Sequence, residues 1–144
     1  LSDLAPVGPC EHQCAISIAQ AHWRLNRSRA IEYNTLGLGH EDFAPDTHAN
    51  SPEVEAAIAQ ARTWSRDSHS LTNITLYEAR INRAIARHEK RLAELQKIRK
   101  TAETAARDLA DYQRLTAEGK LGEAGQRLES LKQKLDLLQR APRK

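Results

Sequence analysis

Residues 71–109 read LTNITLYEARINRAIARHEKRLAELQKIRKTAETAARDL, and this stretch decides the fold. Apolar and small residues recur in it at alternating steps of three and four, and no proline or glycine follows until Gly119. This spacing is typical of a long amphipathic helix with a coiled-coil-like seam. The seam positions are Leu71, Ile74, Ile81, Ile85, Leu92, Leu95, Ala102, Ala106 and Leu109. A helix of this length must lie against another helix, in this chain or in a second copy, to bury the seam.

The long helix is expected to span about residues 70–118 and then to fold back. Gly119-Lys120-Leu121-Gly122 predicts a tight turn near 119–122, with Gly119 as a left-handed cap. The same three-four spacing continues in a last helix, at positions that include Leu128, Leu131 and Leu135. Because the turn is short, we predict a long antiparallel helical hairpin over residues 70–141.

Two details of the seam stand out. His88 falls on it, where a histidine is usually packed or bonded to a partner, although a pH-dependent interface is an alternative. Near Leu95 the register shifts, which indicates a discontinuity in the coiled coil. Beyond it a second phase fits as well as the first, through Ile98, Ala102, Ala105, Leu109 and Tyr112.

The N-terminal part predicts a helical pair over residues 10–69 after an irregular lead-in at 1–9. Pro9 suits the first turn of a helix that runs to about residue 34. Residues 35–50, with two glycines and Pro45, predict an acidic loop. Ser51-Pro52-Glu53 predicts the start of a second helix, which ends or bends in the polar run 65–70. The expected fold is therefore all-α, with two shorter N-terminal helices near the base of the hairpin.

Composition sets broad limits on the function. The 144 residues carry a net charge of +3 and are 28% charged, which permits anionic partners without demanding them. No apolar run approaches the roughly 20 residues of a membrane span, and no secretory signal opens the chain, so we expect a cytoplasmic protein with no membrane partner. Phosphate-binding loops, dinucleotide fingerprints and nucleophile elbows are not found in the sequence, so we do not expect an enzyme or a cofactor.

Metal binding has only weak candidates. Cys10 and Cys14 are four residues apart and share a helix face, and His12 and His22 are close in sequence. His22 lies about 12 Å of helix rise beyond Cys14, which is too far for one tetrahedral zinc site. We therefore interpret the cysteines as small, buried apolar residues and expect no metal.

A run of cations gives a stronger signal. Those that share one flank of the long helix are Arg80, Arg83, Arg87, Lys90 and Arg91. Such a flank can follow the phosphates of a nucleic acid, or it can be a solvated face that shields the seam. No aromatic residues interleave with these cations in the sequence, so base stacking is not indicated. Residues 36–60 hold five acids and no Lys or Arg, and acids such as Glu53 and Glu55 are available to neutralise part of the flank.

Residues 19–32 (AQAHWRLNRSRAIE) and 76–96 (LYEARINRAIARHEKRLAELQ) resemble two helices of a group of uncharacterised bacterial proteins. In that group an AxxxWRLxRxxxxE helix precedes a YEARLxRxxxRALxELxxLQ helix. Ala-Pro-Val-Gly at residues 5–8 also fits, so the resemblance covers about residues 4–100. Cys10 and Cys14 depart from it, since acidic or aliphatic residues are expected at these positions. The resemblance implies a helical fold and brings no established activity or site.

The leading hypothesis is a non-enzymatic helical interaction or assembly module. It would form a homo-oligomer, or bind a helical protein partner, through the long helix and its seam. The alternative is a nucleic-acid-binding accessory protein that uses the basic flank of residues 80–100.

Overall fold

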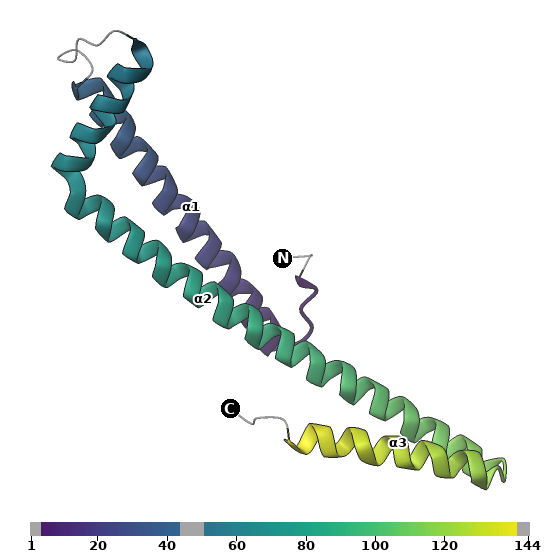
Figure 1. Cartoon of the computed structure of the whole chain (residues 1–144). Helices are drawn as coiled ribbons and strands as arrows, with labels where there is room; N and C mark the ends of the chain where they lie inside the picture. Colours follow the sequence, from purple (N-terminus) through teal and green to yellow (C-terminus); the bar gives the residue numbers. More distant parts are fainter. Residues whose placement is uncertain (1–3, 44–50, 141–144) are drawn as a thin grey trace. The chain divides into compact units, whose positions relative to one another are not determined.

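The computed structural model describes residues 4–43 and 51–140 (Figure 1). Its elements are three α-helices: α1 (Pro9–Phe43), α2 (Pro52–Ala117) and α3 (Leu121–Arg140). The predicted all-α class is confirmed. The predicted arrangement of two shorter helices and a separate long one differs from the observed helices, which are 35, 66 and 20 residues long.

Helix α1 is longer than predicted. The expected loop at 35–50 is helical as far as Phe43, and residues 44–50 of it lie outside the described part. The glycines of this stretch suggested a loop, but Gly39 has a packing role instead. A Cβ at this position would lie 1.9 Å from Oγ1 of Thr63, so only glycine lets α1 approach α2 this closely. Asp42, near the end of α1, pairs with Arg66 at 2.8 Å.

Helix α2 is one continuous helix where the sequence pattern predicted two separate helices. It begins behind Ser51, whose hydroxyl accepts a hydrogen bond from the backbone N–H of Val54 at 3.4 Å, as expected of an N-cap. The polar run 65–70 holds a kink at Asp67 (φ −105°, ψ 17°) but does not end the helix. The bend foreseen in this run is therefore present, and the separate second helix is not.

The chain divides into two compact units, which are described one at a time. The first comprises the described residues of Gln13–Glu89, and the second those of Ser2–His12 and Lys90–Lys144. Helices α1 and α2 each contribute to both units.

In the first unit α1 and α2 lie side by side and antiparallel (Figure 1). Their shared core is a cluster of Ala21, Leu25, Ile81 and Ile85. Nearer the kink Leu71 is completely buried. Ile74 and His88, the other two seam positions of this unit, are half-buried. Helix α1 of the same chain therefore covers this part of the seam.

In the second unit α3 lies antiparallel to the end of α2. Gly119 has φ +74°, as the turn predicts, and the N–H of Lys120 donates to the carbonyl of Leu115 at 2.9 Å. Leu92 and Leu131 are buried. Leu95 and Leu128 are half-buried, and Leu135 is exposed, although it was predicted on the seam.

The seam beyond Leu95 follows a different register from the one first read. Ala102, Ala106 and Leu109 are exposed, and the buried positions are Ala105, Asp108 and Leu115. Of the predicted second phase, Ala105 is buried and Ile98 and Tyr112 are half-buried, but Ala102 and Leu109 are exposed, so that phase is only partly right. The step of thirteen residues from Leu92 to Ala105 does not fit a seven-residue repeat, which indicates a register shift near Leu95. It brings a carboxylate to a buried seam position.

Candidate functional site

The cations predicted as phosphate contacts lie on α2 and divide between the two units. Arg80, Arg83 and Arg87 belong to the first unit and are exposed; we name these three the arginine flank. Lys90 and Arg91 belong to the second unit. Lys90 is exposed, while Arg91 is half-buried and ion-paired. Only the arginine flank can therefore be combined with residues of α1 in the first unit into one site.

The arginine flank is not neutralised within the described part of the chain. No described carboxylate forms an ion pair with Arg80, Arg83 or Arg87, and Nε of Arg83 donates to the carbonyl of Ala79 on its own helix at 3.2 Å. Together with Ala86 the three arginines line a depression of about 510 Å³. Their guanidinium groups therefore present positive charge to the solvent.

A groove between α1 and α2 lies in the same unit and has a volume of about 460 Å³. It is lined by Trp23, Arg24, Arg27, Ser28 and Ile31 of α1 and by Asn73, Ile74 and Tyr77 of α2. Trp23 is 62% exposed and Tyr77 is 47% exposed. Cζ of Arg27 lies 5.6 Å from the centroid of the Trp23 ring, within cation–π range. We name this site the Trp23 groove.

The Trp23 groove and the arginine flank adjoin each other along α2. Arg80 follows Tyr77 by three residues, and Arg87 follows Arg80 by seven, so all three lie on the same side of the helix. The arrangement combines exposed aromatic rings with a row of cations in one unit.

The groove corrects the expectation that aromatic residues are missing beside the cations. In the sequence Trp23 is far from the arginine flank, and only the pairing of α1 with α2 brings its helix to Tyr77. The residues come from two separate stretches of the sequence: Trp23, Arg24 and Arg27 from residues 19–32, and Tyr77 from residues 76–96. Reading each stretch alone did not show that they meet.

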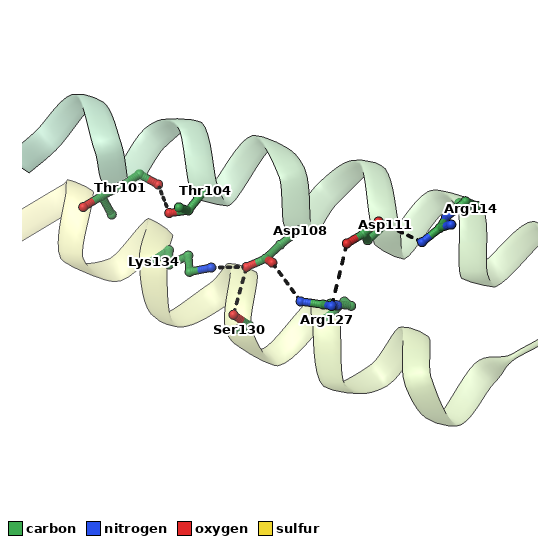
Figure 2. Close-up of polar contacts among 8 residues, drawn as sticks. All are labelled: Thr101, Thr104, Asp108, Asp111, Arg114, Arg127, Ser130 and Lys134. Carbon is green, nitrogen blue, oxygen red and sulfur yellow. Dashed lines mark hydrogen bonds and ion pairs between the residues drawn. The ribbon is translucent and has the colours of Figure 1, made fainter.

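The second unit holds a buried carboxylate that sequence reasoning missed (Figure 2). Asp108 accepts hydrogen bonds from the ammonium of Lys134, from the hydroxyl of Ser130 at 2.8 Å and from Arg127 at 3.4 Å. The bonds from Lys134 first, and then from Ser130, hold the pKa of Asp108 below its ordinary value. Because its oxygens are occupied by side chains of α3, this cluster fastens two helices and offers no free group for chemistry.

A second carboxylate of this unit is also fully engaged. Glu11 accepts the backbone N–H of Val7 at 2.8 Å and Nε of Arg99 at 3.0 Å. The hydrogen bond from Val7, followed by the one from Arg99, lowers the pKa of Glu11. Nearby, the amide of Gln96 donates to the carbonyl of Leu4 at 2.7 Å. These bonds attach the segment before α1 to α2.

Cys10, the neighbour of Glu11 in the sequence, belongs to the second unit, and Cys14 belongs to the first. Both are free thiols; Cys14 is half-buried, but Cys10 is exposed, so the interpretation of both as buried residues is wrong for Cys10. Across residues 4–43 and 51–140, no three His, Cys, Asp or Glu side chains are placed to hold a metal ion together. Over the same residues, none of the helices combines the length and apolarity that a bilayer span requires.

Comparisons with models of protein families, with functionally characterised proteins and with solved structures give no match for this chain. What the chain does must therefore be inferred from the chemistry of its own side chains.

Proposed function

We propose that this chain is a non-enzymatic helical interaction module that forms a homo-oligomer through the outward face of α1. One observation carries the proposal: Ile16, Trp23, Ile31 and Leu38 follow one another at steps of seven, eight and seven, and all four are exposed. This spacing places them on one stripe, on the side of α1 away from the buried Ala15, Ile18 and Leu25.

The surface differs from the one that the sequence suggested. The buried seam positions of α2 are packed against α1 in the first unit and against α3 in the second, so they are not available to a partner; Ala102, Ala106 and Leu109 of the predicted seam are exposed. An exposed apolar stripe at near-heptad spacing is a surface that another helix can cover. A second copy is the partner we favour, because the same stripe on both chains would make a self-complementary interface. The proposed location remains the cytoplasm.

The test is the mass of the full chain in solution by sedimentation velocity over a range of concentrations. Leu38→Asp should weaken self-association about tenfold or more, because a charge would be placed in the interface. Leu121→Asp is the matched control, since Leu121 is also exposed but lies on α3. A chain that stays monomeric at every concentration would overturn this proposal, as would equal effects of the two substitutions.

A second candidate function is nucleic-acid binding, which is favoured because the arginine flank is exposed and forms no ion pair with a described carboxylate. Of the acids expected to neutralise it, Asp42 pairs with Arg66, and Glu53 bonds to its own N–H and to Ser51. Exposed arginines without carboxylate partners can exchange their counterions for phosphates. Binding of labelled duplex DNA that weakens steeply with salt would support this function, and no binding at low salt would exclude it.

A further inference from the structure

We propose that the Trp23 groove and the arginine flank together bind a single-stranded nucleic acid, with a base stacked on Trp23 and the adjoining phosphates held by the flank. This inference rests on the second function proposed above and excludes the first at the same residues, because a homo-oligomer formed through the stripe would cover Trp23 and Ile31. It goes beyond that function by naming the kind of strand and the residues that distinguish it from a duplex.

The exposed rings of Trp23 and Tyr77 favour unpaired bases as the ligand. Trp23 and Tyr77 line one groove and are 62% and 47% exposed, although large aromatic side chains usually contribute most of their area to a core. Base–aromatic stacking is worth about 1–3 kcal/mol per base and accepts any base, since every base has a π-face. A duplex keeps its bases stacked on one another, so these rings favour a strand whose bases are free.

The groove also contains cations that can bind phosphate. Arg24 and Arg27 lie in it with the rings, and the guanidinium of Arg27 is already 5.6 Å from the Trp23 centroid. A guanidinium beside an aromatic ring can extend a stack and can also hold a phosphate. An apolar peptide would leave the charges of Arg24 and Arg27 without an anionic partner. An acidic peptide would gain little binding energy from the rings of Trp23 and Tyr77.

The arginine flank continues along α2 from the Trp23 groove. From Tyr77 to Arg87 the rise along α2 is about 15 Å, at roughly 1.5 Å per residue. A strand that leaves the groove along this side of the helix would meet Arg80 first and then Arg83 and Arg87. Aromatic rings followed by a row of cations are the usual features of proteins that bind single strands without reading their sequence.

The experiment uses the full chain carrying Trp64→Phe, which leaves Trp23 as the sole tryptophan. It is titrated with labelled oligo-uridine and oligo-thymidine of about 15 nucleotides and with a duplex of the same length. We expect tighter binding to the single strands, together with a change in Trp23 fluorescence that saturates as binding does. Trp23→Leu in the chain that retains Trp64 should weaken single-strand binding at least about fivefold, the lower end of the stacking contribution.

The flank is tested in parallel. Arg87→Gln should reduce the slope of log affinity against log salt by about 0.7 on single strands. Arg107→Gln is the matched control, because Arg107 is an exposed arginine of α2 in the second unit. Melting curves of all variants should show that they remain folded, because the substituted positions are exposed.

The outcomes separate this inference from the function on which it rests. Salt-dependent binding to the duplex at equal affinity, with no change in Trp23 fluorescence and no effect of Trp23→Leu, would overturn the single-strand inference and leave nucleic-acid binding intact. No binding to any of the three probes at low salt would overturn both. Weaker binding in Arg107→Gln equal to that in Arg87→Gln would also overturn the inference, because the flank would then have no special role.

Discussion

Gly39 of α1 and Thr63 of α2 lie so close together that no side chain fits at position 39. A Cβ built there would be 1.9 Å from Oγ1 of Thr63. Thr63 is completely buried, and its hydroxyl donates to the carbonyl of Ala59 at 2.8 Å, which holds the side chain in place. This pair sets how near the two helices can come in the first unit.

Gly39→Ala should therefore lower the free energy of unfolding by about 1–3 kcal/mol, since an added methyl must push the helices apart. Gly37→Ala is the control two residues earlier, where a Cβ would meet nothing within 4 Å. It should raise the free energy of unfolding by about 0.5–1 kcal/mol, because alanine is the better helix former. Urea unfolding followed by circular dichroism measures both, and effects of the same sign would contradict the close packing of Gly39.

A second glycine pair tests the turn between α2 and α3. Gly119 has φ +74°, a conformation that a β-branched residue strongly resists, so Gly119→Val should cost about 1 kcal/mol or more. Gly122→Ala lies within α3 in open space and should not destabilise the protein. Thermal melting compares the two variants. A Gly119→Val chain that melts like the unsubstituted one would mean that the turn does not depend on its cap.

These glycines show how far the sequence can predict the fold. The three-four spacing predicts the helices, and Gly119 between two such patterns predicts their reversal. Gly39 carries the same local signal as a loop glycine, and its actual role depends on Thr63, which lies on the next helix. A glycine required by close approach cannot be told from one required by a turn until the helix pairing is known.

The register shift in α2 gives a third prediction. Leu92 is 3% exposed and Leu109 is 43% exposed, although one pattern placed both on the seam. Leu92→Asp should lower the free energy of unfolding by roughly 3 kcal/mol or more, because a charge without a partner enters the core. Leu109→Asp should change it by about 0.5 kcal/mol or less. Urea unfolding compares the two variants, and an equal loss in both would mean that Leu109 is packed in the seam, as both predicted registers place it.

Only part of the candidate site could be predicted from the sequence, because part of it depends on how the helices pack together. The arginine flank follows from spacing along one helix, so Arg80, Arg83 and Arg87 could be selected directly. Trp23 joins them through the pairing of Ala21 and Leu25 with Ile81 and Ile85, a register between helices that no single helix encodes. Contacts within a helix are predictable from periodicity, whereas contacts between helices need the packing itself.

Glu78, on α2 in the first unit, gives a fourth prediction. Its Oε1 is shielded from solvent and has no hydrogen-bond partner among the described residues. Leaving a buried acceptor unpaired costs about 1–3 kcal/mol, so Glu78→Leu should raise the free energy of unfolding by about 1 kcal/mol. Glu78→Ala removes the same carboxylate but fills less of the space, and it should gain less. Thermal melting checks both, and a loss of stability in Glu78→Leu would show that the carboxylate has a stabilising contact.

The last prediction concerns acid stability and Asp108. Its hydrogen bonds with Lys134 and then Ser130 lower its pKa below the ordinary value of 3.8. A carboxyl group whose pKa is lower in the folded chain contributes stability above its unfolded pKa, and this contribution is lost as the pH falls through the folded pKa. The pH range that matters therefore begins near 3.8 and extends below it.

Asp108→Asn should destabilise the chain at neutral pH, because Lys134 and Arg127 lose the carboxylate that faces them. The variant should also lose less of its remaining stability than the unsubstituted chain when the pH is lowered from 5 toward 2, the acid range in which a lowered aspartate pKa acts. Asp136→Asn is the control, since Asp136 pairs with Arg140 on an exposed face of α3 and contributes little. Urea unfolding at a series of pH values gives the slopes. Parallel slopes for Asp108→Asn and the unsubstituted chain would show that the three bonds to Asp108 do not favour its charged form.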